Sequence, residues 1–371
     1  MFKLNFNHQL RLILYLSLSI ILILPSCSTK QNIGNPSQLV EYLSSSESSD
    51  RIQAVIKLIN LGEEALPHLL NDWPNRSYLR ELLISELHEN TISHLVDQIE
   101  HESDPLLISH LLDAISLNNN ISEEHVLSIL QSLNQLAYSD SKIIELLSKI
   151  IIKANCNTAA VKEYLEDIIN IGFSSNNTIS NNAINSIILS YGYLNISKND
   201  LIIEKAIRLA NAKSSDYQIS AAFLLYNIDI NTEGNYSILT QAINEITDAS
   251  DYEQLLLLFK AFILINDDKS IEALINAHSV LNQRDSRLII WAIEDFGVNN
   301  KNVKIVELFL HDIQVVPVPQ IDAIRALMFT KINKQQALEL LESFSNDTNS
   351  VINQSAYPIL NDAIAWLKYT T

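Results

Sequence analysis

The sequence is poor in the residues that break or cross-link regular structure. Its 371 residues include six glycines and eight prolines, too few for a chain of many hairpin strands with a turn after each. Only two cysteines occur, Cys27 and Cys156, and no CxxC or Cys/His spacing of a zinc site is present. We expect Cys156, in Lys153-Ala-Asn-Cys-Asn-Thr, to be an inert, half-buried thiol in a turn between helices.

Positive charge is scarce as well. The formal net charge is −18, and it becomes −20 without residues 1–26, because Lys3 and Arg11 lie there and no acidic residue does. This balance disfavours nucleic acid, whose binding is driven by cationic side chains, and it disfavours electrostatic attraction to anionic lipid. It fits either a basic partner or simple solubility.

The one long apolar run lies near the N-terminus. Leu12 to Leu24 is broken only by one tyrosine and two serines, is preceded by Lys3 and Arg11, and is followed by polar sequence after Cys27. A positive region, a short apolar region and a small residue at the cut describe a secretory signal. Thirteen residues of helix span about 20 Å, short of the roughly 30 Å hydrocarbon core, which disfavours a permanent membrane helix.

The junction Leu24-Pro25-Ser26-Cys27 resembles the lipobox of bacterial lipoproteins, with Pro25 as a departure from the pattern. The resemblance implies cleavage between Ser26 and Cys27, a diacylglyceryl group on the Cys27 thiol, and an anchor in the membrane through that lipid. Ser28, which is not aspartate, implies sorting to the outer membrane, facing the periplasm. The alternatives are an ordinary secretory signal cut near Ser26 and an uncleaved anchor.

The mature chain divides into a tether and a repeat array. Residues 27–37 are polar and predict a short flexible tether, and residues 38–371 carry apolar residues at helical spacing. The first clear unit has one helical stretch before Leu61-Gly62 and a second after it, with Gly62 as a helix-ending residue. Two amphipathic helices per unit, joined by a tight turn, are typical of a helical solenoid.

A steady period supports this interpretation. Aspartate or asparagine, good helix N-caps, precedes successive apolar stretches, and the spacings from Asp104 onward are 36, 37, 39, 35 and 34 residues. These predicted caps are Asp50, Asp104, Asp140, Asn177, Asp216, Asp251 and Asp285. We expect Gly62, Gly192, Asn266 and Gly297 to end first helices.

The second helices are expected at 122–133, 159–169, 200–210, 236–246, 269–281, 301–313 and 334–344. The sequence therefore predicts an all-α fold of about nine two-helix units, with 351–368 as a capping helix at the open end.

The unit that begins at Asp50 resembles a HEAT repeat of the short bacterial type. The matching residues are the Asp50-Arg51 step, Ala54, the Leu61-Gly62 turn and the following Ala65-Leu66. Armadillo and tetratricopeptide arrays are the near alternatives. The sequence lacks the Trp-Leu-Gly-Tyr type spacing of tetratricopeptide repeats, which argues against the second. The resemblance implies an α-solenoid over nearly the whole mature chain. HEAT-like repeats also occur in bilin lyases, so a lyase or enzyme-accessory subunit is the alternative function.

No pattern of catalytic residues supports an enzyme. His88-Glu89 followed by His94 lacks the spacing of a zinc protease, since the second histidine must come four residues on. No GxSxG, GxGxxG or phosphate-binding glycine loop occurs. We therefore expect no cofactor, no metal and no catalytic residue, with a composite histidine site across repeats as the alternative.

Among the aromatic residues, the tyrosines Tyr191, Tyr193 and Tyr226 fall at expected turns and are candidates for exposed contacts. Trp291 and Trp366 have apolar neighbours at helical spacing and are expected in the core.

The function that these observations favour is a non-catalytic scaffold that binds a protein or peptide. We expect the second helices to line a concave face, and their carboxylates to attract basic segments of the partner. These candidate binding residues are Glu163, Glu166, Asp167, Glu204, Glu245, Glu272 and Glu307. A solvated helix face is the alternative for each residue, and a deep pocket with convergent polar groups would instead favour the enzyme.

Overall fold

A computed structural model describes residues 34–71, 73–174, 178–196, 199–212, 215–245, 251–311, 318–330, 334–347 and 351–371. All regular elements in these ranges are helices, and they belong to one compact unit, Pro36–Thr371. The predicted signal peptide, Ser26 and Cys27 lie outside the described residues. None of the described helices is long and apolar enough to cross a membrane.

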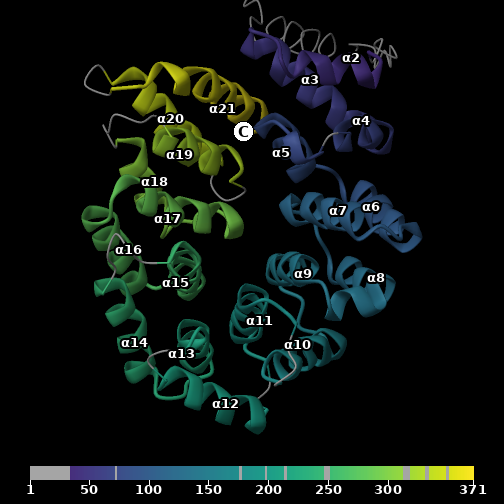
Figure 1. Ribbon diagram of the computed structural model, residues 1–371. Coiled ribbons are helices and arrows are strands. Elements are labelled where there is room, and N and C mark those ends of the chain that lie inside the picture. The colour runs from purple at the N-terminus through teal and green to yellow at the C-terminus, as the bar shows by residue number, and fades with distance from the viewer. Residues whose placement is uncertain are drawn as a thin grey trace, which may run out of the picture. The chain divides into compact units, whose positions relative to one another are not determined.

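The described helices follow one another in nine consecutive pairs, from α3 with α4 to α19 with α20, as Figure 1 shows. The first helices of the pairs are α3 (Ser48–Leu61), α5 (Tyr78–Ser85), α7 (Pro105–Leu117), α9 (Ser141–Ala154), α11 (Asn181–Tyr193), α13 (Gln218–Asn227), α15 (Tyr252–Ile265), α17 (Gln283–Phe296) and α19 (Val318–Met328). The second helices are α4 (Leu66–Leu70), α6 (Glu89–His101), α8 (Glu123–Leu133), α10 (Ala159–Gly172), α12 (Asp200–Ala210), α14 (Thr232–Asn244), α16 (Asp268–Val280), α18 (Val303–Leu310) and α20 (Lys334–Asn346).

Two further helices flank these pairs. The short α2 (Pro36–Tyr42) begins two residues before the predicted start of the array and packs on α3. The last helix, α21 (Tyr357–Thr370), covers α19 and α20, in the region predicted to cap the array. It also contacts α3, so this cap joins the last pair to the first. The all-α repeat fold is thus confirmed.

Stacking of the first helices builds the core. Each first helix from α3 to α17 packs against the next first helix along the chain. Their apolar residues are buried on more than one side, as in α9, where Ile143, Ile144 and Leu146 point to different sides of the helix and are all buried. Because each repeat covers the apolar face of its neighbour, the core is continuous from Leu39 to Leu367.

The helix ends test the predicted capping residues. Asp104, Asp140 and Asp251 are N-caps whose carboxylates accept backbone N–H bonds of the first turn, as predicted. Asp50 and Asp285 instead lie inside the first turn of their helices, because those helices begin two residues earlier, at Ser48 and Gln283.

Among the remaining predicted helix ends, some agree with the structure and others do not. Asp216 precedes Tyr217, which is the residue at the cap position of α13. Ser180 caps α11, and Asn177 lies outside the described residues. Gly62, Asn266 and Gly297 each follow a helix and have a positive φ, which is common for a residue that ends a helix. Gly192 instead lies within α11.

Candidate functional site

A cavity of about 420 Å³ lies among the first helices. Its lining residues come from α5, α7, α9, α11, α15, α17 and α19 and from the segments that follow α7, α17 and α19. Charged groups of both signs line it, together with aromatic rings and amides: Glu81, Lys149, Lys153, Glu294, Asp295, Arg325, Tyr193, Phe296, Phe329, Asn118 and Asn119. First helices therefore form the inner surface, where the sequence predicted second helices.

One side of the cavity is held by a carboxylate between two lysines. Asp295 on α17 lies 2.7 Å from Nζ of Lys149 on α9 and 2.8 Å from Nζ of Lys260 on α15. Burial alone would raise the pKa of Asp295, but the two lysines outweigh it and hold this pKa far below its ordinary value. Burial would lower the pKa of Lys149, and Asp295 reverses that shift. Asp295 and Lys149 are therefore charged at neutral pH, and the two ion pairs of Asp295 join α9, α15 and α17.

The other side of the cavity carries an arginine shared by two carboxylates. Nη2 of Arg325 on α19 lies 2.8 Å from Glu81 on α5, and its Nε lies 3.8 Å from Glu294 on α17. Nε of Arg76 also lies 3.1 Å from the Glu81 carboxylate. Glu81 thus has two guanidinium partners, while Glu294 has only the longer contact.

Glu294, which lines the cavity, has a pKa shifted toward neutral pH. Burial, opposed by Arg325 and helped by Asp322, Glu81 and Asp295, raises its pKa to about 8. Its buried Oε1 accepts no hydrogen bond from the described residues. At pH 7 this carboxyl is therefore mostly protonated.

Amide and lysine side chains join neighbouring repeats at the rim of the cavity. Asn118 Nδ2 donates to the carbonyl oxygens of Ile84 at 2.6 Å and Leu87 at 3.1 Å, across two repeats. Lys153 Nζ donates to the carbonyl oxygens of Ser116 at 2.7 Å and Leu117 at 3.3 Å. These bonds reach backbone carbonyls at or just after the C-terminal ends of α5 and α7.

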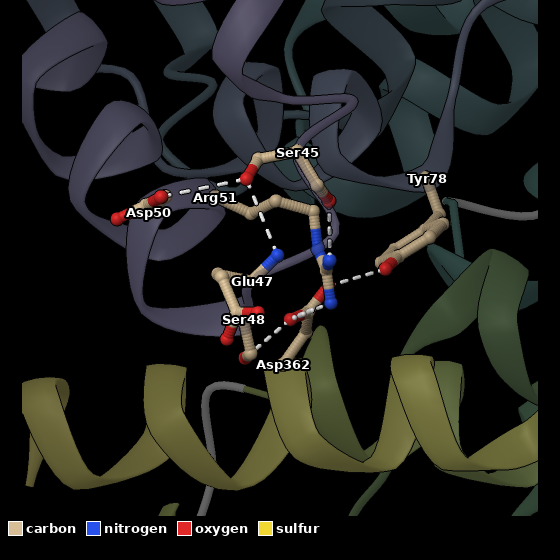
Figure 2. Close-up of polar contacts among 7 residues, drawn as sticks. All are labelled: Ser45, Glu47, Ser48, Asp50, Arg51, Tyr78 and Asp362. Carbon is tan, nitrogen blue, oxygen red and sulfur yellow. Dashed lines mark hydrogen bonds and ion pairs between the residues drawn. The ribbon is translucent and has the colours of Figure 1, made fainter.

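A second polar cluster joins the first repeat to the last helix. Asp362 on α21 is fully buried and accepts two bonds from Arg51 on α3, from Nε at 2.8 Å and from Nη2 at 2.7 Å. Figure 2 shows that Ser48 and Tyr78 also donate to this carboxylate. Arg51 Nη1 donates to the carbonyl oxygen of Ser45 at 2.6 Å. The hydrogen bond to Asp362, opposed by burial, raises the pKa of Arg51, and burial with the Asp362 bond raises that of Tyr78.

The predicted binding carboxylates lie away from the cavity, on second helices or directly after one. Five of them are exposed: Glu163, Asp167, Glu204, Glu245 and Glu272. Glu307 is half-buried, and so is Glu166, which accepts hydrogen bonds from Tyr191 at 2.9 Å and Asn199 at 3.0 Å. Glu166 thus has a structural role in joining α10 to the next repeat. That these carboxylates bind a partner stays a prediction.

Two predictions about individual side chains need correction. Tyr191 is fully buried in α11, since the helix continues past it to Tyr193, and only Tyr193 is exposed at the cavity. Cys156 lies in the turn between α9 and α10 as predicted but is fully buried, and burial raises the pKa of its thiol. Trp366 lies in the core as expected, and Trp291 is half-buried.

Sequence reasoning named Tyr193 but missed the charged residues of the cavity. Lys149, Lys260 and the Glu294-Asp295 pair each interrupt an apolar stretch of a first helix. A charge inside such a stretch is the signal that could have found them, because an ion is rarely buried without a partner.

The fold defines the class of protein, an all-α helical-repeat protein whose helices pack in pairs. No protein-family profile matches the chain, and no curated protein does. Among solved structures, the chain is similar to an engineered protein from the Northeast Structural Genomics Consortium, with 16% identity, 90% of this chain and 99% of that chain covered, and a TM-score of 0.31. A second engineered protein from the same consortium matches with 16% identity, coverage of 81% and 99%, and a TM-score of 0.18.

Proposed function

We propose that the protein is a non-catalytic binding scaffold, anchored to the bacterial outer membrane through Cys27, whose second helices bind a basic segment of a periplasmic protein. The repeat fold supports a binding role, because stacked helix pairs offer an extended surface. The anchor follows from the lipobox resemblance at Leu24-Pro25-Ser26-Cys27.

The observation that carries the proposed partner chemistry is a set of exposed carboxylates without counter-ions. Glu163 and Asp167 on α10 and Glu272 on α16 are exposed, and no cationic group of the described residues lies within 4.0 Å of them. By contrast, the carboxylates of the first helices at the cavity are paired with lysine or arginine. Free surface charges of one sign raise the rate of association with a partner of opposite charge and steer its approach.

The test is partner capture with charge-reversed variants. Protein cross-linked in intact cells is recovered from detergent extracts for the wild type and for the triple variant Glu163→Lys, Asp167→Lys, Glu272→Lys. A stoichiometric envelope partner should be recovered with the wild type and lost with the variant. The complex of the wild type with this partner should also weaken as the salt concentration is raised.

A matched control changes the same number of charges elsewhere. Glu41, Glu63 and Glu64 are exposed near the N-terminal pair, and their replacement by lysine should leave partner recovery unchanged. Equal loss of the partner in both triple variants, or equal recovery from both, would show that net charge or another surface is responsible.

The cavity favours the second candidate, an enzyme or enzyme-accessory subunit, because polar groups converge on it. The ion pairs there hold Lys149 and Asp295 in their charged forms, so neither is poised to transfer a proton. Glu294, with a pKa of about 8, is suited to acid–base chemistry near neutral pH. A catalytic role for this group would need a second reacting group close by, and we therefore rank this candidate below the scaffold.

A further inference from the structure

The charges around the cavity leave one carboxyl without a cation of its own. Asp295 is paired with two lysines at 2.7 and 2.8 Å, and Glu81 is paired with Arg76 and Arg325 at 3.1 and 2.8 Å. Glu294 must share Arg325, at 3.8 Å. Because Asp295 and Glu81 hold the nearer cations, Glu294 is the carboxyl of the cavity with capacity to accept a further positive charge.

Groups of both signs surround Glu294. Burial first, and then the negative charges of Asp322 on α19, Glu81 on α5 and Asp295 beside it on α17, oppose its ionisation, whereas Arg325 favours it, as does Lys149 on α9. Lys153, also on α9, lines the cavity with its Nζ bonded to the carbonyl oxygens of Ser116 and Leu117. Asp322 is itself bound to Arg287, at 2.8 Å. The Glu294 side chain is 21% exposed and lines the cavity, although its Oε1 is buried and accepts no hydrogen bond from the described residues.

The walls of the cavity suit a small organic ion. Tyr193, Phe296 and Phe329 line it, and aromatic rings attract cations through their negative faces. A volume of about 420 Å³ falls within the range of small-molecule sites. Among the described residues no group of three or more histidine, cysteine, aspartate or glutamate side chains could hold a metal ion.

We propose that this cavity binds a small organic cation through a primary ammonium group, which pairs with the carboxylate of Glu294. An ammonium offers three hydrogen-bond donors, enough to bond the carboxylate and a neighbouring amide or hydroxyl oxygen. The alkyl part of the ligand lies against the aromatic rings. The site is separate from the exposed carboxylates proposed to bind a protein partner, so each proposal can fail without the other.

Binding is coupled to the release of a proton. With a pKa of about 8, the free Glu294 carboxyl is mostly protonated at pH 7, and the arriving ammonium takes the place of that proton. Affinity therefore rises with pH up to about 8 and levels off above it. From pH 6 to pH 8 the association constant should rise roughly 50-fold if the bound carboxyl stays ionised at pH 6.

The experiment is calorimetric titration of the full-length protein with putrescine and, separately, with N-acetyl-lysine amide. Each should bind at one site per chain at pH 8 and more weakly at pH 6, with a proton released near pH 7. Tighter binding of putrescine identifies a free amine as the ligand, and tighter binding of the lysine amide identifies a lysine side chain of a peptide. No binding of either compound up to about 10 mM at pH 8 overturns the proposal.

Two variants separate this site from general electrostatic attraction. Glu294→Gln keeps the size and hydrogen-bonding shape of the protonated carboxyl, so the fold should persist, as circular dichroism can check. Its affinity at pH 8 should fall roughly 10- to 100-fold, and its pH dependence should disappear. Glu272→Gln removes an exposed carboxylate of α16 and should bind as the wild type does. Unchanged binding or an unchanged pH profile in Glu294→Gln contradicts the proposal.

Discussion

At the residue scale, Asp362 is a buried carboxylate that accepts hydrogen bonds from three other side chains. It is fully buried, and its partners Arg51, Ser48 and Tyr78 come from the beginning of the repeat array, close to 300 residues away in sequence. A buried ion pair contributes little when both partners are counted, but removal of one partner leaves the other charge buried and unpaired. The effect of substitution should therefore be large for a single residue.

Asp362→Ala should cost about 3–5 kcal/mol of stability where α3 packs on α21, because the Arg51 guanidinium, only 8% exposed, loses its carboxylate. Hydrogen exchange of α3 and α21 measures this cost locally, which suits a repeat protein whose parts can open separately. A matched control is Glu342→Ala on α20. It removes the partly exposed carboxylate that pairs with Lys368 on α21, and it should cost less than about 1 kcal/mol.

The double variant Arg51→Met, Asp362→Leu tests the cause. Since it leaves no unpaired charge, it should be markedly more stable than Asp362→Ala. Equal exchange rates in the two variants would show that packing, and not the buried charge, controls this contact.

At the element scale, the structure separates aspartates that cap helices from aspartates that only stand near a helix start. Asp140 accepts bonds from the backbone nitrogens of Lys142 and Ile143, at 2.9 and 3.0 Å. Asp50 lies in the first turn of α3. Its negative charge interacts favourably with the helix dipole there, but Asp50 is not the cap residue. Asp140→Ala should thus destabilise α9 by about 1 kcal/mol, and Asp50→Ala should cost only a few tenths.

Chemical denaturation and hydrogen exchange of the first turn of α9 can measure the difference between these variants. Equal losses of stability would mean that proximity to the helix start matters more than the hydrogen bonds of the cap.

The same comparison shows how much of the fold could be predicted from the sequence. Helix positions followed from local patterns, so α12 has the predicted bounds, 200–210, and α10 and α20 begin where expected. Helix starts predicted from a single aspartate were wrong at Asp50 and Asp285, because those helices begin earlier, at Ser48 and Gln283.

The candidate site could not be predicted in this way. Helical periodicity shows that a helix has an apolar face, but it does not show which helices of a repeat array meet each other. Lys149 and Asp295 lie in repeats far apart in sequence, and only the packing of α9 near α17 brings them within 2.7 Å. For Arg51 the sequence indicated a repeat motif, and its bond to Asp362 became visible only when α21 was seen to contact α3.

At the scale of the whole molecule, the proposed anchor and the acidic surface act together. Without residues 1–26 the chain has a net charge of −20, which anionic headgroups would repel, so the lipid proposed on Cys27 would supply the attraction to the membrane. A single acyl chain binds a membrane only marginally, whereas the group expected here carries several.

The lipid on Cys27 is itself open to direct test. Cells expressing the wild type should incorporate labelled palmitate into the protein and should process it in a globomycin-sensitive way, whereas Cys27→Ala should do neither, because the thiol is the acceptor. Ser28→Ala, one residue further on, is the matched control and should retain both. Processing without label would indicate an ordinary secretory signal cut near Ser26, and an unprocessed, unlabelled wild type would indicate an uncleaved anchor. Labelling of Cys27→Ala equal to that of the wild type would refute lipidation at this residue, and the scaffold would then need another means of reaching the membrane.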